Sequence, residues 1–233
     1  MKLRIITTMV TIITTTIMTE GRYRLMTWLS PAYPVGGYSY SHGLEQAVEA
    51  GLVTDRATLS DWIEDCLRHG AGRSDAILAA FAWRAEDDAT RAELAELALA
   101  LQPARERLLE SEAQGAAFQL VTAAVWPAGA IAAAPLPYPV AVGAAARAHA
   151  IPLDDMLEAW LWAFTANLVS AGVRLVPLGQ TDGQRVQAAM MPVVLAVAAE
   201  AATSGLDDIG GCAFLADIAA MRHETQHVRL FRS

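Results

Sequence analysis

The pattern with the clearest catalytic chemistry is a His-Glu-x-x-His sequence near the C-terminus, made of His223, Glu224 and His227. On a helix this spacing places two imidazoles one turn apart, where they can bind zinc with the glutamate as the general base of a hydrolase. Such a site also needs a third ligand, and no His, Glu, Asp or Cys follows His227. A zinc metallohydrolase therefore stands as the alternative function, and a polar helix end followed by a cationic tail is the favoured interpretation.

The tail from Arg222 to Ser233 alternates arginines with the apolar side chains of Val228, Leu230 and Phe231. It has too little apolar surface to fold alone, so we expect it to dock on another surface. Aromatic and arginine side chains are the usual anchors of protein interfaces. The tail is therefore a predicted partner-binding segment.

Lysine is nearly absent, since Lys2 is the only one among 17 basic residues. A phosphate-binding loop needs a lysine for the nucleotide phosphates, and a pyridoxal enzyme needs one for its Schiff base. Neither can be built around a lysine beside the N-terminus. If nucleotide hydrolysis is involved, another protein must carry it out.

Composition and charge exclude other classes. A net charge of -8 and an isoelectric point near 5.1 argue against nucleic acid as a partner. The two cysteines, Cys66 and Cys212, are far apart and form no CxxC pattern, which favours a reduced compartment and a cytoplasmic protein.

Two segments superficially resemble membrane signals. Residues 1–24 begin with a threonine-rich stretch that lacks a cleavage motif, and we interpret them as a disordered or misassigned extension, with Met1, Met18 or Met26 as the true start. The uncharged run from Ala113 to Ala146 is interrupted by prolines, which predicts a buried helix and a proline-rich connection. No membrane span is expected.

Residues 25–233 are predicted to form one all-α domain, because apolar residues recur with helical spacing and no alternating β-branched run appears. Two helices carry capping-box spacings, at Thr90 and Thr181. The predicted helices lie near residues 44–52, 59–67, 77–85, 90–101, 104–125, 153–172, 181–198 and 207–221.

Two of these helices carry more specific expectations. The 153–172 helix should end at Gly172, and Trp162 lies off its apolar stripe, which predicts burial on two sides. The last helix should begin at Asp207 and Asp208, with its large apolar side chains inward. Those side chains are Leu206, Ile209, Phe214, Ile218 and Met221, together with Ala213.

Three segments contain residues that the packing of helices alone does not explain. In Ser30–Glu45, prolines and paired glycines fix an irregular loop that presents tyrosines and a histidine ahead of a helix. In Ser170–Arg185, Pro177 and Gly179 make a helix–helix connection, for which a capped loop is favoured over a ligand site. The third is the C-terminal segment from Asp217 to Ser233.

In order and spacing, these three segments resemble the urease accessory protein family UreF, from about Leu25 to Ser233. Arg105-Glu-Arg107, with Ser111 and Gln114-Gly115, is similar to the central motif of that family. An aromatic residue is common in the family where His227 stands, which favours a coincidental zinc-site match.

The resemblance implies a non-catalytic helical scaffold in nickel-urease maturation. Members form two-fold homodimers, bind the accessory protein UreD (also called UreH) and with it recruit the GTPase UreG. GTP hydrolysis then delivers nickel to the urease apoprotein, and the family has been given a role in modulating that hydrolysis. The resemblance implies no cofactor for this chain, since nickel and GTP are handled by its partners.

Carried over residue by residue, the resemblance implies partner-binding positions in all three segments. In the first they are Tyr38, Ser39, Tyr40, His42 and Glu45. In the second they are Arg174, Gln180, Asp182 and Arg185, as an interface or as its internal support. In the third they are Arg222, His223, Glu224, Gln226, Arg229, Leu230, Phe231, Arg232 and Ser233.

Overall fold

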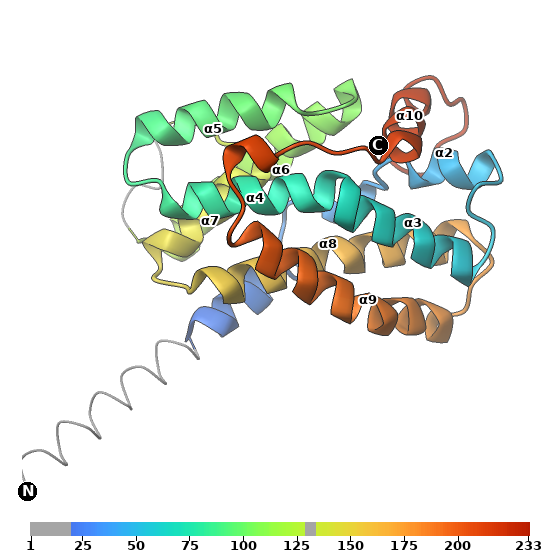
Figure 1. Cartoon of the computed structure of the whole chain (residues 1–233), viewed down its shortest axis with the longest axis horizontal. Coiled ribbons are helices and arrows are strands. Elements are labelled where there is room, and N and C mark those ends of the chain that lie inside the picture. The colour runs from blue at the N-terminus through green and yellow to red at the C-terminus, as the bar shows by residue number, and fades with distance from the viewer. Residues whose placement is uncertain (1–19, 129–133) are drawn as a thin grey trace, which may run out of the picture.

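The computed structural model describes residues 20–128 and 134–233, and within these ranges it contains helices and no strand (Figure 1). The predicted all-α class is confirmed. After a helical segment at residues 20–28, the elements are η1 (Gly37–Ser39), α2 (Leu44–Glu49), α3 (Arg56–His69), α4 (Ala71–Arg84), α5 (Asp88–Ala100), α6 (Arg105–Val125), α7 (Tyr138–Ala148), α8 (Leu153–Leu175), α9 (Gln180–Ala201), η2 (Leu206–Asp208) and α10 (Phe214–His223).

Helix α4 lies in the middle of the bundle and packs against α3, α5, α7, α8 and α9 (Figure 1). Its tightest neighbour is α7, where a Cβ added to Gly143 would lie 2.2 Å from the Ala79 carbonyl oxygen. Alanines and this glycine let the two backbones approach closely. Helix α7 was not predicted, because its residues are almost uniformly small and apolar and so show no helical periodicity.

Helix α3 follows its sequence pattern closely. Its predicted apolar stripe is buried, and its first turn is capped by Asp55, whose side chain accepts a hydrogen bond from the Thr58 N–H. Each large side chain in the stripe contributes about 1.5–3 kcal/mol by leaving water. The stripe comprises Leu59, Trp62, Ile63, Cys66 and Leu67.

Helix α8 departs from two expectations. It continues past Gly172 to Leu175, because that glycine is a contact point, with Leu59 of α3 packed where a Cβ would lie. Trp162 is 49% exposed, so the expectation of burial around Trp162 was wrong.

Two predicted capping boxes are also wrong. Helix α5 begins earlier, with Asp87 as its cap accepting from the Thr90 N–H, and α9 begins after Gly179 with no side-chain cap. The continuation of α9 through Pro192 agrees with the predicted helix.

The last helix differs from the prediction in its first residue and in the side that it buries. Asp207 and Asp208 lie in the short η2 turn, and α10 starts only at Phe214. Its inner side is formed by small residues, since Ala220 lies so close to Gly43 that a Cβ there would be 2.6 Å from the Ala220 nitrogen. The predicted inward residues Leu206, Phe214, Ile218 and Met221 are all exposed instead, and Leu215 joins them on the outside.

The helical segment at residues 20–28 packs on the bundle. Gly21 is buried beside Ile151, and Arg22 forms an ion pair with Asp155 at 3.5 Å. Residues 1–19, which include most of the proposed extension, lie outside the described residues. Among the helices that are described, none is both long enough and apolar enough to cross a membrane.

Candidate functional site

The C-terminal segment, residues 224–233, folds back beside α10 and lies next to α2 and the preceding loop (Figure 1). The Ser41 N–H donates to the Ser233 carbonyl at 2.7 Å, and the Arg232 N–H donates to the Ser39 carbonyl at 2.8 Å. Ser41 and Ser233, which are 192 positions apart in sequence, are therefore joined by a backbone hydrogen bond. These bonds bring together the first and third segments identified from the sequence.

Glu45, in the first turn of α2, anchors this arrangement. It is only 7% exposed, and its two carboxylate oxygens accept hydrogen bonds from the Leu230 N–H at 2.6 Å and the Phe231 N–H at 2.9 Å. Hydrogen bonds to a charged group contribute about 1.5–3 kcal/mol each. Glu45 thus provides hydrogen-bond acceptors for two backbone N–H groups of a C-terminal segment that has no secondary structure of its own.

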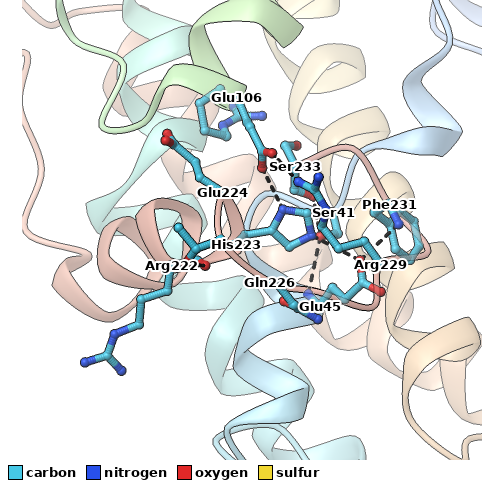
Figure 2. A network of polar contacts seen from close by, with 12 residues as sticks. Ser41, Glu45, Glu106, Arg222, His223, Glu224, Gln226, Arg229, Phe231 and Ser233 are labelled. Carbon is cyan, nitrogen blue, oxygen red and sulfur yellow. Dashed lines mark hydrogen bonds and ion pairs between the residues drawn. The ribbon is translucent and has the colours of Figure 1, made fainter.

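His223, the last residue of α10, is fully buried between two carboxylates (Figure 2). Its Nδ1 atom is 2.6 Å from Glu106 and its Nε2 atom is 3.1 Å from Glu45. Each ring nitrogen of an imidazole donates or accepts a hydrogen bond according to the tautomer. Arg229 also pairs with Glu106, at 2.5 Å.

This geometry does not favour the zinc-hydrolase alternative. Helix α10 ends at His223, both of whose nitrogens face carboxylates, while His227 is exposed beyond the helix. Glu224 accepts the Arg105 N–H at 2.7 Å and so caps α6. Across residues 20–128 and 134–233, no three His, Cys, Asp or Glu side chains are grouped to hold a metal ion.

A second buried network surrounds Glu110 on α6. Its carboxylate pairs with Arg107, contacts His42 Nε2 at 2.9 Å and accepts from Gln114 at 3.0 Å. The Ser233 hydroxyl donates to the same carboxylate at 2.8 Å. The end of the chain is therefore held by α6 as well as by α2.

Charge in this network shifts the pKa of several groups. Burial disfavours ionisation of Glu110, but the Arg107 guanidinium and the contact with His42 outweigh it and lower its pKa to about 2. Burial and the Arg107 charge lower the pKa of His42. Burial raises the pKa of nearby Asp75 to about 7, although Arg107 acts in the opposite direction. His42, Asp75 and Arg107 also line a cavity of about 140 Å3, and Tyr38 is part of the same lining.

Arg174 of α8 connects the loop to the C-terminal segment. It donates to the Tyr38 carbonyl at 2.8 Å, and its guanidinium lies 4.2 Å from the centre of the Phe231 ring. Asn167, two turns earlier, donates to the Tyr40 carbonyl at 3.1 Å. Tyr38 itself remains 66% exposed, so the loop is fixed by its backbone while this side chain faces outward.

The other residues predicted in the second segment lie apart from these contacts. Asp182 pairs with Arg185 at 2.9 Å and with Arg56 of α3 at 3.4 Å, and Gln180 is the exposed first residue of α9. The contact between Asp182 and Arg56 joins α9 to α3, so this segment is a connection between helices, but the predicted side-chain cap is absent from the start of α9.

The remaining predicted positions divide between the surface and the interior. Tyr40, Glu45, His223, Phe231 and Ser233 are buried, and Ser39, His42 and Gln226 are partly buried. The exposed side chains are those of Tyr38, Arg222, Glu224, Arg229, Leu230 and Arg232, and Arg222 points away from the network in Figure 2.

Sequence reasoning missed Ser41, Glu106, Glu110 and Asn167. A signal was present on α6, where Arg107, Glu110, Ser111 and Gln114 recur at helical spacing and are all buried. A polar stripe on the inner side of a helix requires partners from elsewhere in the chain.

Comparison with known proteins places the sequence in a family. Residues 53–191 match the family model described as UreF. The urease accessory protein UreF of Rhodopseudomonas palustris strain HaA2 is 52% identical over 220 residues, which cover 91% of this chain and 93% of that protein. UreF of Bradyrhizobium diazoefficiens is 50% identical, covering 91% of each chain. The chain belongs to the UreF family of urease accessory proteins.

Proposed function

We propose that this protein is a non-catalytic scaffold for nickel insertion into apo-urease. It binds UreD (UreH) through its C-terminal region, recruits the GTPase UreG with it in the cytoplasm, and acts as a homodimer. The partner proteins carry the nickel and the GTP. This chain modulates nickel insertion and GTP hydrolysis by holding those partner proteins together.

The observation that carries this proposal is the outward apolar side of α10. Phe214, Leu215, Ile218 and Met221 are between 42% and 68% exposed on a ten-residue helix whose inner side is alanine and His223. Exposed apolar side chains gathered on one short helix mark a protein interface. The helix leads directly into the C-terminal segment, where Val228 and Leu230 are also exposed.

The buried networks support this proposal by fixing the orientation of that surface. His223 and Glu45 hold the end of α10 on α2, and Ser233 holds the segment on α6. A preorganised surface loses less conformational entropy when a partner binds. In the proposal, Phe231 is therefore an internal support for the interface, and Val228 and Leu230 are its contact residues.

The proposal includes no hydrolytic role for this chain, and the available side-chain chemistry supports that. The single lysine, Lys2, leaves no phosphate-binding loop, and His223 is occupied by carboxylates. The purified protein should hydrolyse neither peptides nor GTP. A peptidase or GTPase activity that disappears in His223→Ala would refute this part of the proposal.

Co-purification with UreD and UreG tests the interface. Leu215→Arg should weaken UreD binding by about 30-fold or more, because an apolar anchor contributes about 2 kcal/mol and a buried unpaired charge adds a cost. UreG should be recovered with the protein only when UreD is present. Deleting residues 228–233 should also abolish UreD binding.

The matched control is Leu120→Arg on α6, where an equally apolar side chain is 74% exposed. This variant should bind UreD normally. Normal UreD binding by a folded Leu215→Arg protein would show that α10 is not the anchor, and the Tyr38–Glu45 segment would then take its place.

A further inference from the structure

Around the C-terminal segment, carboxylates lie inside and guanidinium groups lie outside. Glu45, Glu106 and Glu110 all accept hydrogen bonds or form ion pairs with groups of the same chain. Figure 2 shows Glu45 and Glu106 directed at His223, while the Arg222 side chain extends away from the network. The negative charge of this region is therefore compensated within the chain.

The guanidinium groups on the outside have fewer partners. Those of Arg105, Arg222 and Arg232 form no ion pair or hydrogen bond with any described residue, and all three residues are exposed. The Arg229 side chain pairs with Glu106 but is still 38% exposed. The four arginines are called here the arginine face.

The arginine face gathers around the first turns of α6. Arg105 is the first residue of that helix, and its N–H is bonded to Glu224, two residues after Arg222. Arg229 pairs with the second residue of α6, and the residue after Arg232 donates to the same helix one turn further on. Residues that are far apart in sequence thus form one positively charged surface.

This surface is unusual on an acidic protein. The chain has a net charge of -8, yet residues 222–233 contain three arginines and a single glutamate. The negative charge of the rest of the chain repels nucleic acids and anionic membranes, which disfavours both as the partner. Arg222 is also part of α10, whose outward side is apolar. An apolar centre with a charged rim is the usual composition of a protein interface.

We infer that the arginine face is the rim of the contact with the accessory partner, and that this partner presents carboxylates to it. The inference rests on the proposed function, because it concerns the surroundings of the apolar contact on α10. Exposed ion pairs add little to affinity, but opposite charges steer two proteins together and so raise the association rate. Arginine suits such a rim, since its planar guanidinium binds a carboxylate through two parallel hydrogen bonds.

The association kinetics of UreD test this inference. In a double variant, Arg222→Glu with Arg232→Glu, the association rate constant should fall by about tenfold or more at low salt, because the steering charge is reversed. The difference from wild type should shrink as the salt concentration rises from about 50 mM to about 500 mM, since salt screens exposed charges. Biolayer interferometry over this salt series measures both rate constants, and the dissociation rate constant should change much less.

Two control proteins separate the position of the charge from its amount. Arg222→Lys with Arg232→Lys keeps the charge and should associate at close to the wild-type rate. Arg22→Glu with Arg147→Glu makes the same change in net charge near α7, away from α10 in Figure 1, and should associate almost normally. Circular dichroism checks that every variant is folded.

The inference is wrong if the folded charge-reversed protein associates with UreD at the wild-type rate at low salt, or if the control near α7 slows association equally. Normal UreD association with loss of UreG recruitment would assign the arginine face to UreG instead. Binding of the wild type to a mixed-sequence RNA, lost on charge reversal while UreD association is unchanged, would make the partner a nucleic acid. Wild-type protein that binds no UreD at any salt concentration would refute the proposed function, and this inference with it.

Discussion

Glu45→Gln should release the C-terminal segment while leaving the helical bundle folded. In the wild type, one carboxylate oxygen accepts the Leu230 N–H, and the other accepts the Phe231 N–H and contacts His223. Glutamine preserves the shape of the side chain but replaces one acceptor oxygen with an NH2 group. In its best orientation it keeps the oxygen with two contacts and leaves the Leu230 N–H facing a donor.

The cost can be worked out from these contacts. One backbone N–H without a partner costs about 1–3 kcal/mol, and two bonds to a carboxylate become weaker neutral bonds. Together these changes amount to about 2–4 kcal/mol for docking of the segment. Since 1.4 kcal/mol is a factor of ten in an equilibrium, hydrogen exchange at the Leu230 and Phe231 amides should accelerate by at least about 30-fold.

Hydrogen exchange followed by NMR measures this effect at single amides, and amides in the middle of α4 serve as an internal reference. Glu49→Gln is the matched control, because it lies one turn further along α2 and is exposed. Exchange at Leu230 and Phe231 that matches wild type in Glu45→Gln would refute the assignment of Glu45 as the anchor.

Three further predictions concern stability. Burial raises the pKa of Asp75 to about 7, so its contribution to the free energy of unfolding is fully present below about pH 4 and is lost as pH rises to 7. The free energy of unfolding of Asp75→Asn, measured with urea, should therefore rise relative to that of wild type by up to about 4 kcal/mol between pH 4 and pH 8. A difference between the two proteins that does not change with pH would contradict this. Gly43→Ala should lower the free energy of unfolding by more than about 1 kcal/mol, because Gly43 has a φ of 77° and its Cβ would meet α10; an unchanged melting temperature would contradict the close packing. Removal of residues 1–17 should leave the melting temperature and partner binding unchanged, since the family resemblance begins at Leu25, and a large fall in melting temperature would show that this segment packs on the domain.

The sequence predicted those features that depend on local pattern. The buried stripe of α3 and the length of α6 follow from apolar spacing and flanking prolines, both of which act within a few residues. Helix α7 escaped prediction because burial on all sides removes the periodicity that marks a helix surface. The orientation of α10 escaped for a different reason. Its alanines face inward because Gly43 permits close contact. Gly43 is far from this helix in sequence, so the contact leaves no local pattern from which it could be predicted.

The candidate site was likewise predicted only in part. The resemblance located its three segments, but it did not reveal that Glu45 and Glu110 bind the end of the chain. Side-chain pairs separated by more than a hundred positions leave no local pattern in either segment. The buried polar stripe on α6 indicates that its side chains need hydrogen-bond partners, but it does not identify those partners.

The distance in sequence between Glu45 and its partners also sets an order in time. Leu230 lies 185 positions after Glu45, so during synthesis the glutamate leaves the ribosome on the order of ten seconds before the amide it will bind. Throughout that interval the Glu45 carboxylate lacks the Leu230 and Phe231 amides that it binds in the folded protein. The surface built from the loop, α10 and the C-terminal segment is therefore completed only after residues 224–233 have been translated, and a nascent chain that lacks them cannot present this surface.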